Sequence, residues 1–338
     1  MSVDDQRYEA RSAVVVAVGS TAAVPPIPGL ADARPWTSHE VTTAREIPAG
    51  LIVLGGGVVG VEMAQAYSEL GATVTIVEAL ERLVAGEEPF VAEELGAAFR
   101  ERGIDIRLGV TAETVHRDGE IVTVELSDAR SVEAAEILVA TGRRPLTADL
   151  GLESVGLEPG ETIEVDDTLR VPKLPWLFAV GDVNGRSLLT HMAKYQARVA
   201  AQVIAGREAR ATRDDHGAPR VIFTDPQLAA VGLTLQRARD GGINARAYDV
   251  ATSDTPGASF HGRNTPGTSR LVVDEDRSVI VGATFTGTEV ADWLQAASIA
   301  LVGEIPLARL QQAVPAFPTR SEVWLRLLER WNAQTPSA

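Results

Sequence analysis

The chain has 338 residues, which is long enough for two or three domains with cores of their own, because a domain usually takes roughly 100–200 residues. Its formal net charge is −15 and no cluster of basic residues interrupts it, so we expect neither nucleic acid nor a membrane surface as a partner. The absence of cysteine excludes disulfides, thiolate catalysis and cysteine-bound metals from these residues, and the scattered histidines predict no catalytic metal.

The first predicted element is a buried strand over residues 14–18, which ends at Gly19. The segment before it, MSVDDQRYEA, lacks the basic start and apolar run of a signal peptide, and no apolar stretch reaches the roughly 18 residues of a membrane span. We therefore expect a cytoplasmic protein. The proline-rich segment VPPIPGL, which follows the strand, is typical of an irregular crossing between domains.

The most informative segment is LIVLGGGVVGVEMAQAYSELGATVTIVE, residues 51–78. Four apolar residues predict a buried strand, and after the glycines the apolar residues recur at helical spacing. Gly55 permits the tight turn, Gly57 leaves the backbone open to phosphates, and Gly60 lets the helix lie close to the strand. The free N–H groups at the helix start then face the two phosphate charges of a dinucleotide. The residues predicted to hold it at this turn are Gly55, Gly57, Val58, Val59 and Gly60.

A second apolar strand, residues 73–77, ends at Glu78, which lies 18 residues past Gly60. A carboxylate there accepts hydrogen bonds from the ribose hydroxyls and repels a 2′-phosphate. The segment therefore predicts an NAD site that prefers NADH to NADPH. Arg82 is able to pair with a 2′-phosphate, so NADP stays open as an alternative. The structural alternative is a glycine-rich turn in some other βα unit. The order and spacing of strand, glycines, helix, strand and acid disfavour this alternative.

Three predicted strands end in a small residue followed by glycine. This pattern is typical of sites where backbone without a large side chain contacts a ligand at the carboxyl edge of a sheet. These strands precede Gly19, Gly142 in ATGRRP, and Gly181 in LFAVGD. The strand before Gly142 is predicted over residues 137–140. Before it, we predict a helix and two strands over residues 90–101, 104–108 and 122–126.

The pattern changes in the carboxyl-terminal third of the chain. A helix is predicted over residues 190–205, and the polar stretch GREARATRDDHG after it marks a domain boundary. Strands followed by helices then predict an α+β domain with a mainly antiparallel sheet. The predicted strands cover residues 221–223, 245–250, 271–273 and 278–286, and the predicted helices cover residues 289–302 and 321–331.

Five motifs in this order resemble those of the pyridine nucleotide-disulfide oxidoreductases, the flavoenzyme family of dihydrolipoamide dehydrogenase, glutathione reductase and mercuric reductase. They are AVGS at 17–20, GGGVVGVE at 55–62, ATGRRP at 140–145, LFAVGDV at 177–183 and FTDPQLAAVGLT at 223–234. The resemblance covers nearly the whole chain. It implies an α/β fold in which a doubly wound NAD-binding domain is inserted in an FAD-binding domain, followed by an α+β dimerisation domain.

The resemblance also implies residues that hold FAD. Asp182 corresponds to the aspartate that binds the ribityl chain, and Gly19 belongs to the first flavin motif. In LTHMA, the backbone of Thr190, His191 and Met192 corresponds to the helix start that faces the flavin pyrimidine. The positive end of the helix dipole would there stabilise negative charge on the reduced ring.

Two more residues are assigned to NAD in the same way. Glu62 occupies the position of the family's acid beside the nicotinamide, with a solvated helix residue as the alternative. Gly142, at its strand exit, is counted with the NAD-binding residues.

Two departures from the family pattern concern catalysis. The family's own glycine loop for FAD and the following CxxxxC pair are missing, so we expect an N-terminally truncated chain with an incomplete FAD domain, which holds NAD better than FAD. Phe317 stands where the family has the histidine that exchanges a proton with the active-site thiol, and phenylalanine transfers no proton. Glu322, the acid that orients this histidine, is retained, and we favour for it the role of a first-turn acid on the terminal helix. We expect no intact catalytic residue.

We predict four segments: a remnant of the FAD-binding domain over 1–48, the NAD-binding domain over 49–145, the returning part of the FAD-binding domain over 146–215, and the dimerisation domain over 216–338. The predicted function is hydride transfer from NADH to FAD and on to an unknown small-molecule electron acceptor, in a homodimer. One alternative is a non-catalytic, dimerising NAD-binding remnant. Another is a split enzyme whose flavin half is a separate polypeptide.

Overall fold

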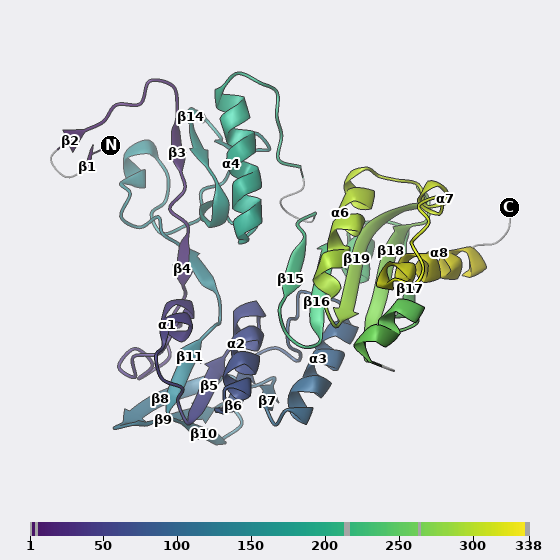
Figure 1. Cartoon of the computed structure of the whole chain (residues 1–338). Coiled ribbons are helices and arrows are strands. Elements are labelled where there is room, and N and C mark those ends of the chain that lie inside the picture. Colours follow the sequence, from purple (N-terminus) through teal and green to yellow (C-terminus); the bar gives the residue numbers. More distant parts are fainter. Residues whose placement is uncertain (1, 4–5, 213–216, 263–264, 335–338) are drawn as a thin grey trace. The chain divides into compact units, whose positions relative to one another are not determined.

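The computed structural model describes residues 2–3, 6–212, 217–262 and 265–334 (Figure 1). The chain divides into two compact units, each built from two stretches of sequence. Unit 1 combines residues 1–21 with 143–218, and unit 2 combines residues 22–142 with 219–338. Among the described residues, no helix is both long enough and apolar enough to cross a membrane.

Unit 1 contains a small sheet in the order β13-β14-β3. β3 (Val14–Val16) and β14 (Leu174–Ala179) are parallel, so their carboxyl ends lie at the same edge, and β13 (Arg170–Val171) is antiparallel to β14. The helix α4 (Thr190–Ile204) packs against this sheet through a cluster that includes Phe178. The remaining elements are β1 (Ser2–Val3), β2 (Gln6–Arg7), β4 (Ser20–Ala22), β12 (Arg143–Pro145), and the short 3-10 helices η1 (Leu152–Val155) and η2 (Gly181–Asn184).

The amino-terminal part of unit 2 is a parallel sheet in the order β11-β5-β6-β7. Its strands and helices are β5 (Gly50–Leu54), α2 (Val58–Glu69), β6 (Thr73–Glu78), α3 (Pro89–Glu101), β7 (Asp105–Leu108) and β11 (Glu136–Val139). Every residue of β5 is buried, because alternate side chains enter two clusters on opposite faces of the sheet. The carboxyl ends of β5 and β6 are adjacent, so the turns that follow them meet.

One face of the parallel sheet is covered by a second, antiparallel sheet in the order β10-β9-β8. Its strands are β8 (Ala112–Asp118), β9 (Ile121–Leu126) and β10 (Ser131–Ala134), of which the sequence predicted only β9. Residues 22–48, which we predicted with the FAD remnant, group here with unit 2. The physical reason is burial: Leu30 is fully buried in the same cluster, and the Trp36 N–H donates to the Ile137 carbonyl oxygen at 2.8 Å, just before α1 (Ser38–Thr43).

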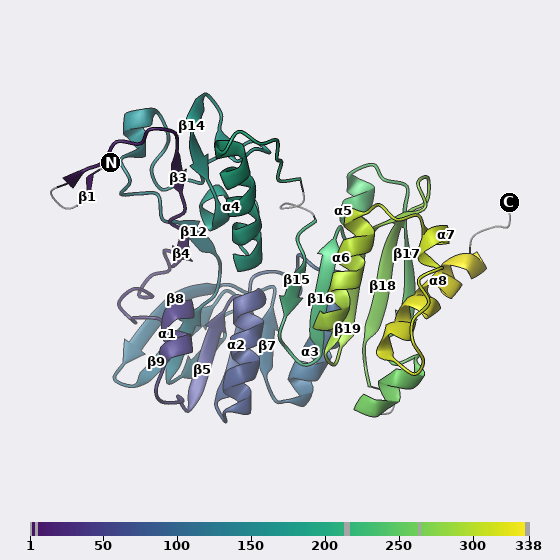
Figure 2. The same ribbon diagram turned by 45° about the horizontal axis from the view of Figure 1, so that its top comes forward.

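The carboxyl-terminal part of unit 2 is an antiparallel sheet in the order β15-β16-β19-β18-β17, with α6 and α8 on one face (Figure 2). The strands are β15 (Arg220–Ile222), β16 (Gln227–Gly232), β17 (Ala245–Ala251), β18 (Thr268–Asp274) and β19 (Val279–Gly287). The helices are α5 (Leu235–Asp240), η3 (Pro256–His261), η4 (Val290–Trp293), α6 (Leu294–Val302), α7 (Leu307–Leu310), η5 (Arg320–Glu322) and α8 (Val323–Gln334). The predicted α+β arrangement is confirmed, although the sequence missed β16. The predicted boundary at residues 215–216 lies outside the described residues.

Candidate functional site

Two glycines shape the turn between β5 and α2. Gly55 has a φ of +106°, which L side chains rarely adopt, and its N–H donates to the Val77 carbonyl oxygen at 2.8 Å. A Cβ on Gly60 would lie 1.9 Å from the carbonyl oxygen of Gly55. Only glycine at residue 60 therefore lets α2 approach the turn this closely, as the sequence predicted.

Gly57 differs from these two because its side-chain space is open. It is the N-cap of α2 and makes no side-chain capping bond, and a Cβ at Gly57 would meet no atom within 4 Å. The N–H groups of the first helical turn have no partners inside the helix. They begin at Val58, which is 47% exposed, so a phosphate group has access to them.

Glu78, at the end of β6, binds the same turn with its carboxylate. Its Oε2 accepts a hydrogen bond from the Gly56 N–H at 2.5 Å, and its Oε1 accepts one from the Leu80 N–H at 2.8 Å. Gly56, to which the sequence analysis gave no role, makes room for this contact, since a Cβ there would lie 2.6 Å from a methyl carbon of Leu83 and 3.1 Å from Glu78 Oε2. The two N–H donors hold the carboxylate against the glycine turn.

The turn and the end of β6 line a cavity of about 710 Å³ within unit 2. Small-molecule and cofactor sites typically span about 300–1,000 Å³. Of the predicted NAD residues, four line this cavity, namely Gly55, Gly57, Val58 and Glu78, and the other four, Val59, Gly60, Glu62 and Gly142, lie outside its described lining. Arg82 also lines it, and its Nη2 donates to the Ala85 carbonyl oxygen at 2.8 Å.

Apolar side chains supply much of the remaining wall, including Pro25, Ile27, Leu80, Val84, Val110 and Ile222. No pattern in the sequence predicts them as cavity residues. They come from separate parts of the chain and share no spacing, so only the fold brings them to one cavity.

Glu62 links α2 to the carboxyl-terminal part of unit 2. Its Oε1 accepts a hydrogen bond from the Phe223 N–H at 2.8 Å, and Gln65, one turn further along α2, accepts one from the Asp225 N–H at 2.8 Å. Contact between Glu62 and a nicotinamide stays a prediction. A nicotinamide bound there would contact the same carboxylate that accepts the hydrogen bond from the Phe223 N–H.

Two carboxylates also join the cavity wall to the antiparallel sheet. Glu87 lines the cavity and binds Arg220 through both of its oxygens, at 2.6 and 2.7 Å. Its neighbour Glu88 is only 2% exposed and accepts a hydrogen bond from Arg270 Nη1 at 2.9 Å. The pKa of the Arg270 guanidinium is raised, chiefly by its hydrogen bond to Asp249 and in smaller part by Glu88. Ion pairs of Glu87 with Arg220 and of Glu88 with Arg270 therefore help, together with packing, to hold this wall of the cavity in place.

In unit 1, Asp182 follows β14 at the edge where the parallel strands end. Ser20 Oγ donates to Asp182 Oδ2 at 2.5 Å, and Arg143 Nε donates to Ser20 Oγ at 2.7 Å while lying 3.7 Å from the same carboxylate. The Asp182 side chain is 22% exposed, so it is held in place and remains open to solvent. Gly19, just before Ser20, has a φ of +76° and open side-chain space. The contacts of Ser20 and Arg143 with Asp182 leave no pattern in the sequence.

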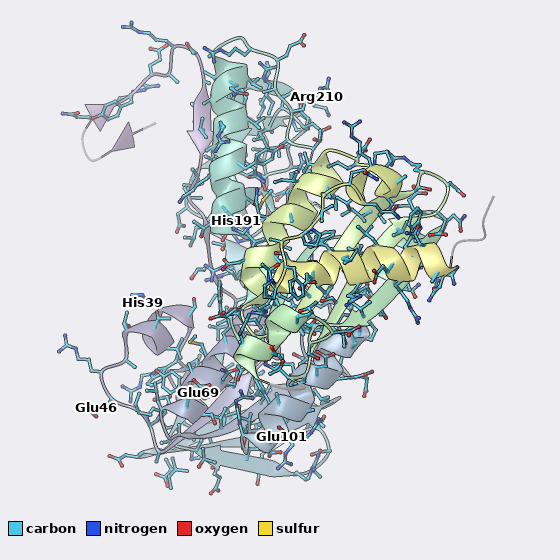
Figure 3. The ribbon with its side chains drawn as sticks, turned by 45° about the vertical axis from the view of Figure 1, so that its right-hand side comes forward. His39, Glu46, Glu69, Glu101, His191 and Arg210 are labelled. Atoms are coloured by element: carbon cyan, nitrogen blue, oxygen red, sulfur yellow. The ribbon has the colours of Figure 1, made fainter. Side chains whose placement is uncertain are left out.

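The amino terminus of α4 lies in the same unit (Figure 3, His191). No side chain caps it, so the N–H groups of its first turn keep their capacity to bind a negatively charged group. Thr190 and His191 are exposed and Met192 is buried. Gln196 Oε1, on the same helix, accepts a hydrogen bond from the Gly181 N–H at 2.7 Å and so fixes the helix to the loop that carries Asp182.

The two residues near the carboxyl terminus differ in exposure. Phe317 is 75% exposed, and Glu322 is 7% exposed. Glu322 Oε2 accepts a hydrogen bond from the Thr319 N–H at 3.3 Å in a capping box at the start of η5, just before α8, and its role as a first-turn acid of the terminal helix stays a prediction. Among the described residues, no group of three histidine, aspartate or glutamate side chains is placed to hold a metal ion.

Models of two protein families match the chain. The model described as pyridine nucleotide-disulphide oxidoreductase matches residues 2–197, and the model of the dimerisation domain of pyridine nucleotide-disulphide oxidoreductases matches residues 218–327. The two matches follow each other in the order that the five motifs predicted.

Curated relatives and solved structures agree with these matches. Mercuric reductase of Bacillus cereus is 31% identical over 314 residues, which cover 91% of this chain and 49% of that protein. Dihydrolipoyl dehydrogenase of Mycobacterium leprae is 33% identical over 319 residues, which cover 91% of this chain and 67% of that protein. The structure of LpdA from Mycobacterium tuberculosis is similar with a TM-score of 0.85 and 26% identity, covering 94% of this chain and 69% of that one. The chain thus spans 49% and 67% of the lengths of these two curated relatives.

Proposed function

Because the chain belongs to the pyridine nucleotide-disulphide oxidoreductase family, we propose that it serves an FAD-dependent oxidation of NADH, with transfer of the electrons to a small-molecule acceptor. The observation that carries the proposal is the cavity of about 710 Å³ at the uncapped start of α2, with the Glu78 carboxylate fixed beside it. An oxidoreductase of this family needs such a site for its nicotinamide cofactor.

The residues of this cavity fit a dinucleotide. The open space at Gly57 leaves the first N–H groups of α2 within reach of a pyrophosphate. Glu78 can accept hydrogen bonds from ribose hydroxyls, and its charge would repel a 2′-phosphate, which supports a preference for NADH. Arg82 also lines the cavity, and its hydrogen bond to the Ala85 carbonyl oxygen competes with any use of its charge for NADP.

The residues of unit 1 fit one part of FAD. Asp182 would bind the polyol chain, with Ser20 and Arg143 holding its carboxylate, and the first turn of α4 would face the flavin ring. When both cofactors are bound, the nicotinamide supplies a hydride, which is one proton and two electrons, to the flavin. We propose residues 1–21, from the predicted segment 1–48, and residues 146–215 as the flavin-binding segments, and residues 49–145 as the NAD-binding domain.

We also propose that residues 216–338 form the surface of a homodimer. Four large apolar side chains of this part are strongly exposed: Phe223 at 68%, Phe260 at 75%, Val314 at 84% and Phe317 at 75%. Residues 218–327 match the family's dimerisation domain, which supports an interaction surface in this part of the chain. The cytoplasmic location that the sequence predicts stays a prediction.

A second candidate function is NAD binding and dimerisation without catalysis. The observation that favours it is Phe317, which occupies the position of the family's proton-exchanging histidine and is exposed in the structure. The absence of cysteine in these 338 residues also leaves no thiol to pass electrons to a disulfide.

The two candidates differ in measurable ways. Titration of the purified chain with NADH and NADPH, followed by the fluorescence of the reduced nicotinamide, should give saturable binding with tighter affinity for NADH. Added FAD that stays with the protein on gel filtration, together with NADH-driven reduction of a dye, would support the oxidoreductase. NADH binding without dye reduction at any FAD concentration would favour the non-catalytic function, and no binding of either nucleotide would refute both.

A further inference from the structure

A second cavity, of about 230 Å³, lies in the carboxyl-terminal part of unit 2. Its lining shares no residue with the dinucleotide cavity and comes from η4, α6, residues 310–315 and the segment around α8. An engineered cavity of about 150 Å³ binds benzene, and sites for drug-sized ligands begin near 300 Å³. This cavity therefore has room for one aromatic ring and a short chain.

Two tryptophans line this cavity. Trp293 and Trp324 both line the cavity, and their rings lie 5.9 and 6.0 Å from the ring of Phe285, measured between centroids. Phe285 is fully buried, so the core holds both indoles in place. Leu310 and Leu328 add apolar lining. Arg320 already lies over the Trp293 ring, so Trp324 is the indole that an aromatic ligand carrying positive charge would contact.

The charge at the cavity has the matching sign. Asp292 lines it and is exposed, and within the described part of the chain its carboxylate has neither an ion pair nor a hydrogen bond. Arg320 lies over the Trp293 ring at 4.5 Å, but it donates to the Thr288 carbonyl oxygen and its charge is paired with Glu289 at 3.8 Å. The charge left for a ligand is therefore the negative charge of Asp292.

We propose that this cavity binds a small aromatic amine in its protonated form, with the ring against the Trp324 indole and the ammonium group at Asp292. Its lining includes none of the residues proposed to bind the nucleotide or the flavin, and binding involves no redox step. A neutral aromatic alcohol of the same size binds more weakly, because it lacks the ion pair. An aromatic carboxylate binds most weakly, because its charge is repelled.

Benzylamine, benzyl alcohol and benzoate, titrated at constant ionic strength into the full chain, test this proposal. Tryptophan emission should change saturably with benzylamine, at about a fifth of the dissociation constant of benzyl alcohol, which corresponds to an exposed ion pair of about 1 kcal/mol. Asp292→Asn should remove this difference and leave benzyl alcohol unaffected. Equal affinity for all three probes, or no saturable change with any of them, would overturn the proposal.

Matched variants locate the site. Trp324→Leu should weaken benzylamine about two- to tenfold, the range expected for one aromatic contact, whereas Trp331→Leu on the same helix should not. Ala296→Leu fills the cavity from α6 without removing a ring, and it should abolish binding of every probe. Gln295→Leu, which adds a similar side chain on the same helix outside the lining, should leave binding intact. Undiminished binding in folded Ala296→Leu, checked by circular dichroism, would refute the assignment.

Discussion

Gly57 offers a substitution that separates the needs of the fold from those of the dinucleotide. Its backbone, with φ −77° and ψ −173°, is open to any residue, and a Cβ there would meet no atom within 4 Å. Threonine and glycine are about equally good N-cap residues. We therefore expect Gly57→Thr to change the free energy of unfolding by no more than about 0.5 kcal/mol, as for a surface substitution.

Binding should respond very differently, because the threonine side chain fills the space through which a pyrophosphate approaches α2. Hydrogen bonds to charged groups contribute about 1.5–3 kcal/mol each. Loss of one such bond to the first turn weakens NADH about tenfold, and loss of two weakens it about a hundredfold or more. We therefore expect the dissociation constant for NADH to rise at least about tenfold, and about a hundredfold if two of these bonds are lost.

The assay pairs NADH titration with urea denaturation of the same preparation. Gly60→Ala serves as the contrasting variant, since its Cβ would lie 1.9 Å from the Gly55 carbonyl oxygen. Overpacking of this kind typically costs about 1–3 kcal/mol, so Gly60→Ala should lose stability while Gly57→Thr keeps it. Wild-type NADH affinity in a stable Gly57→Thr protein would show that the start of α2 does not bind the pyrophosphate. Unfolding of Gly57→Thr would contradict the open space at this residue.

Three further substitutions test other parts of the structure. Glu78→Gln removes the charge that repels a 2′-phosphate, so the ratio of the NADPH and NADH dissociation constants should fall about fivefold, as for one exposed charge pair, and an unchanged ratio would argue against Glu78 as the discriminating residue. Glu88→Ala removes one of the two carboxylates that bind Arg270 and also the acceptor of the Leu235 N–H, so it should lower the urea-derived stability by about 1–3 kcal/mol, whereas Glu93→Ala, an exposed acid on α3, should change it by less than about 0.5 kcal/mol. The pKa of Glu40 is lowered, first by the hydrogen bond from the Thr37 hydroxyl, so its contribution to stability is present above the ordinary carboxyl pKa and is lost as pH falls through the lowered value. Thr37→Ala should raise this pKa in an NMR titration, and an unchanged pKa would exclude the hydroxyl as its main cause.

The sequence alone determined the elements whose signal is local. The glycine turn after residues 51–54, the acid at Glu78 and the helix over 90–101 all follow from spacing within a few tens of residues, and the structure has β5, Glu78 and α3 at these places. The motifs in chain order also identified the family, which the two family models confirm. Local patterns suffice here because a buried strand, a tight turn and an amphipathic helix each impose their own periodicity.

The tertiary structure decided which residues share a site. Glu62 has an ordinary helical position in the sequence, and only the fold places the Phe223 N–H against its carboxylate. Arg143 lies 123 residues from Ser20, to which it donates a hydrogen bond. Such contacts follow from how sheets and helices pack, and they leave no periodicity in the chain, because any residue that reaches the right edge of the right sheet can make them. The sequence therefore specified the glycine turn between β5 and α2, whereas the walls of the cavity beside it became visible only in the folded chain.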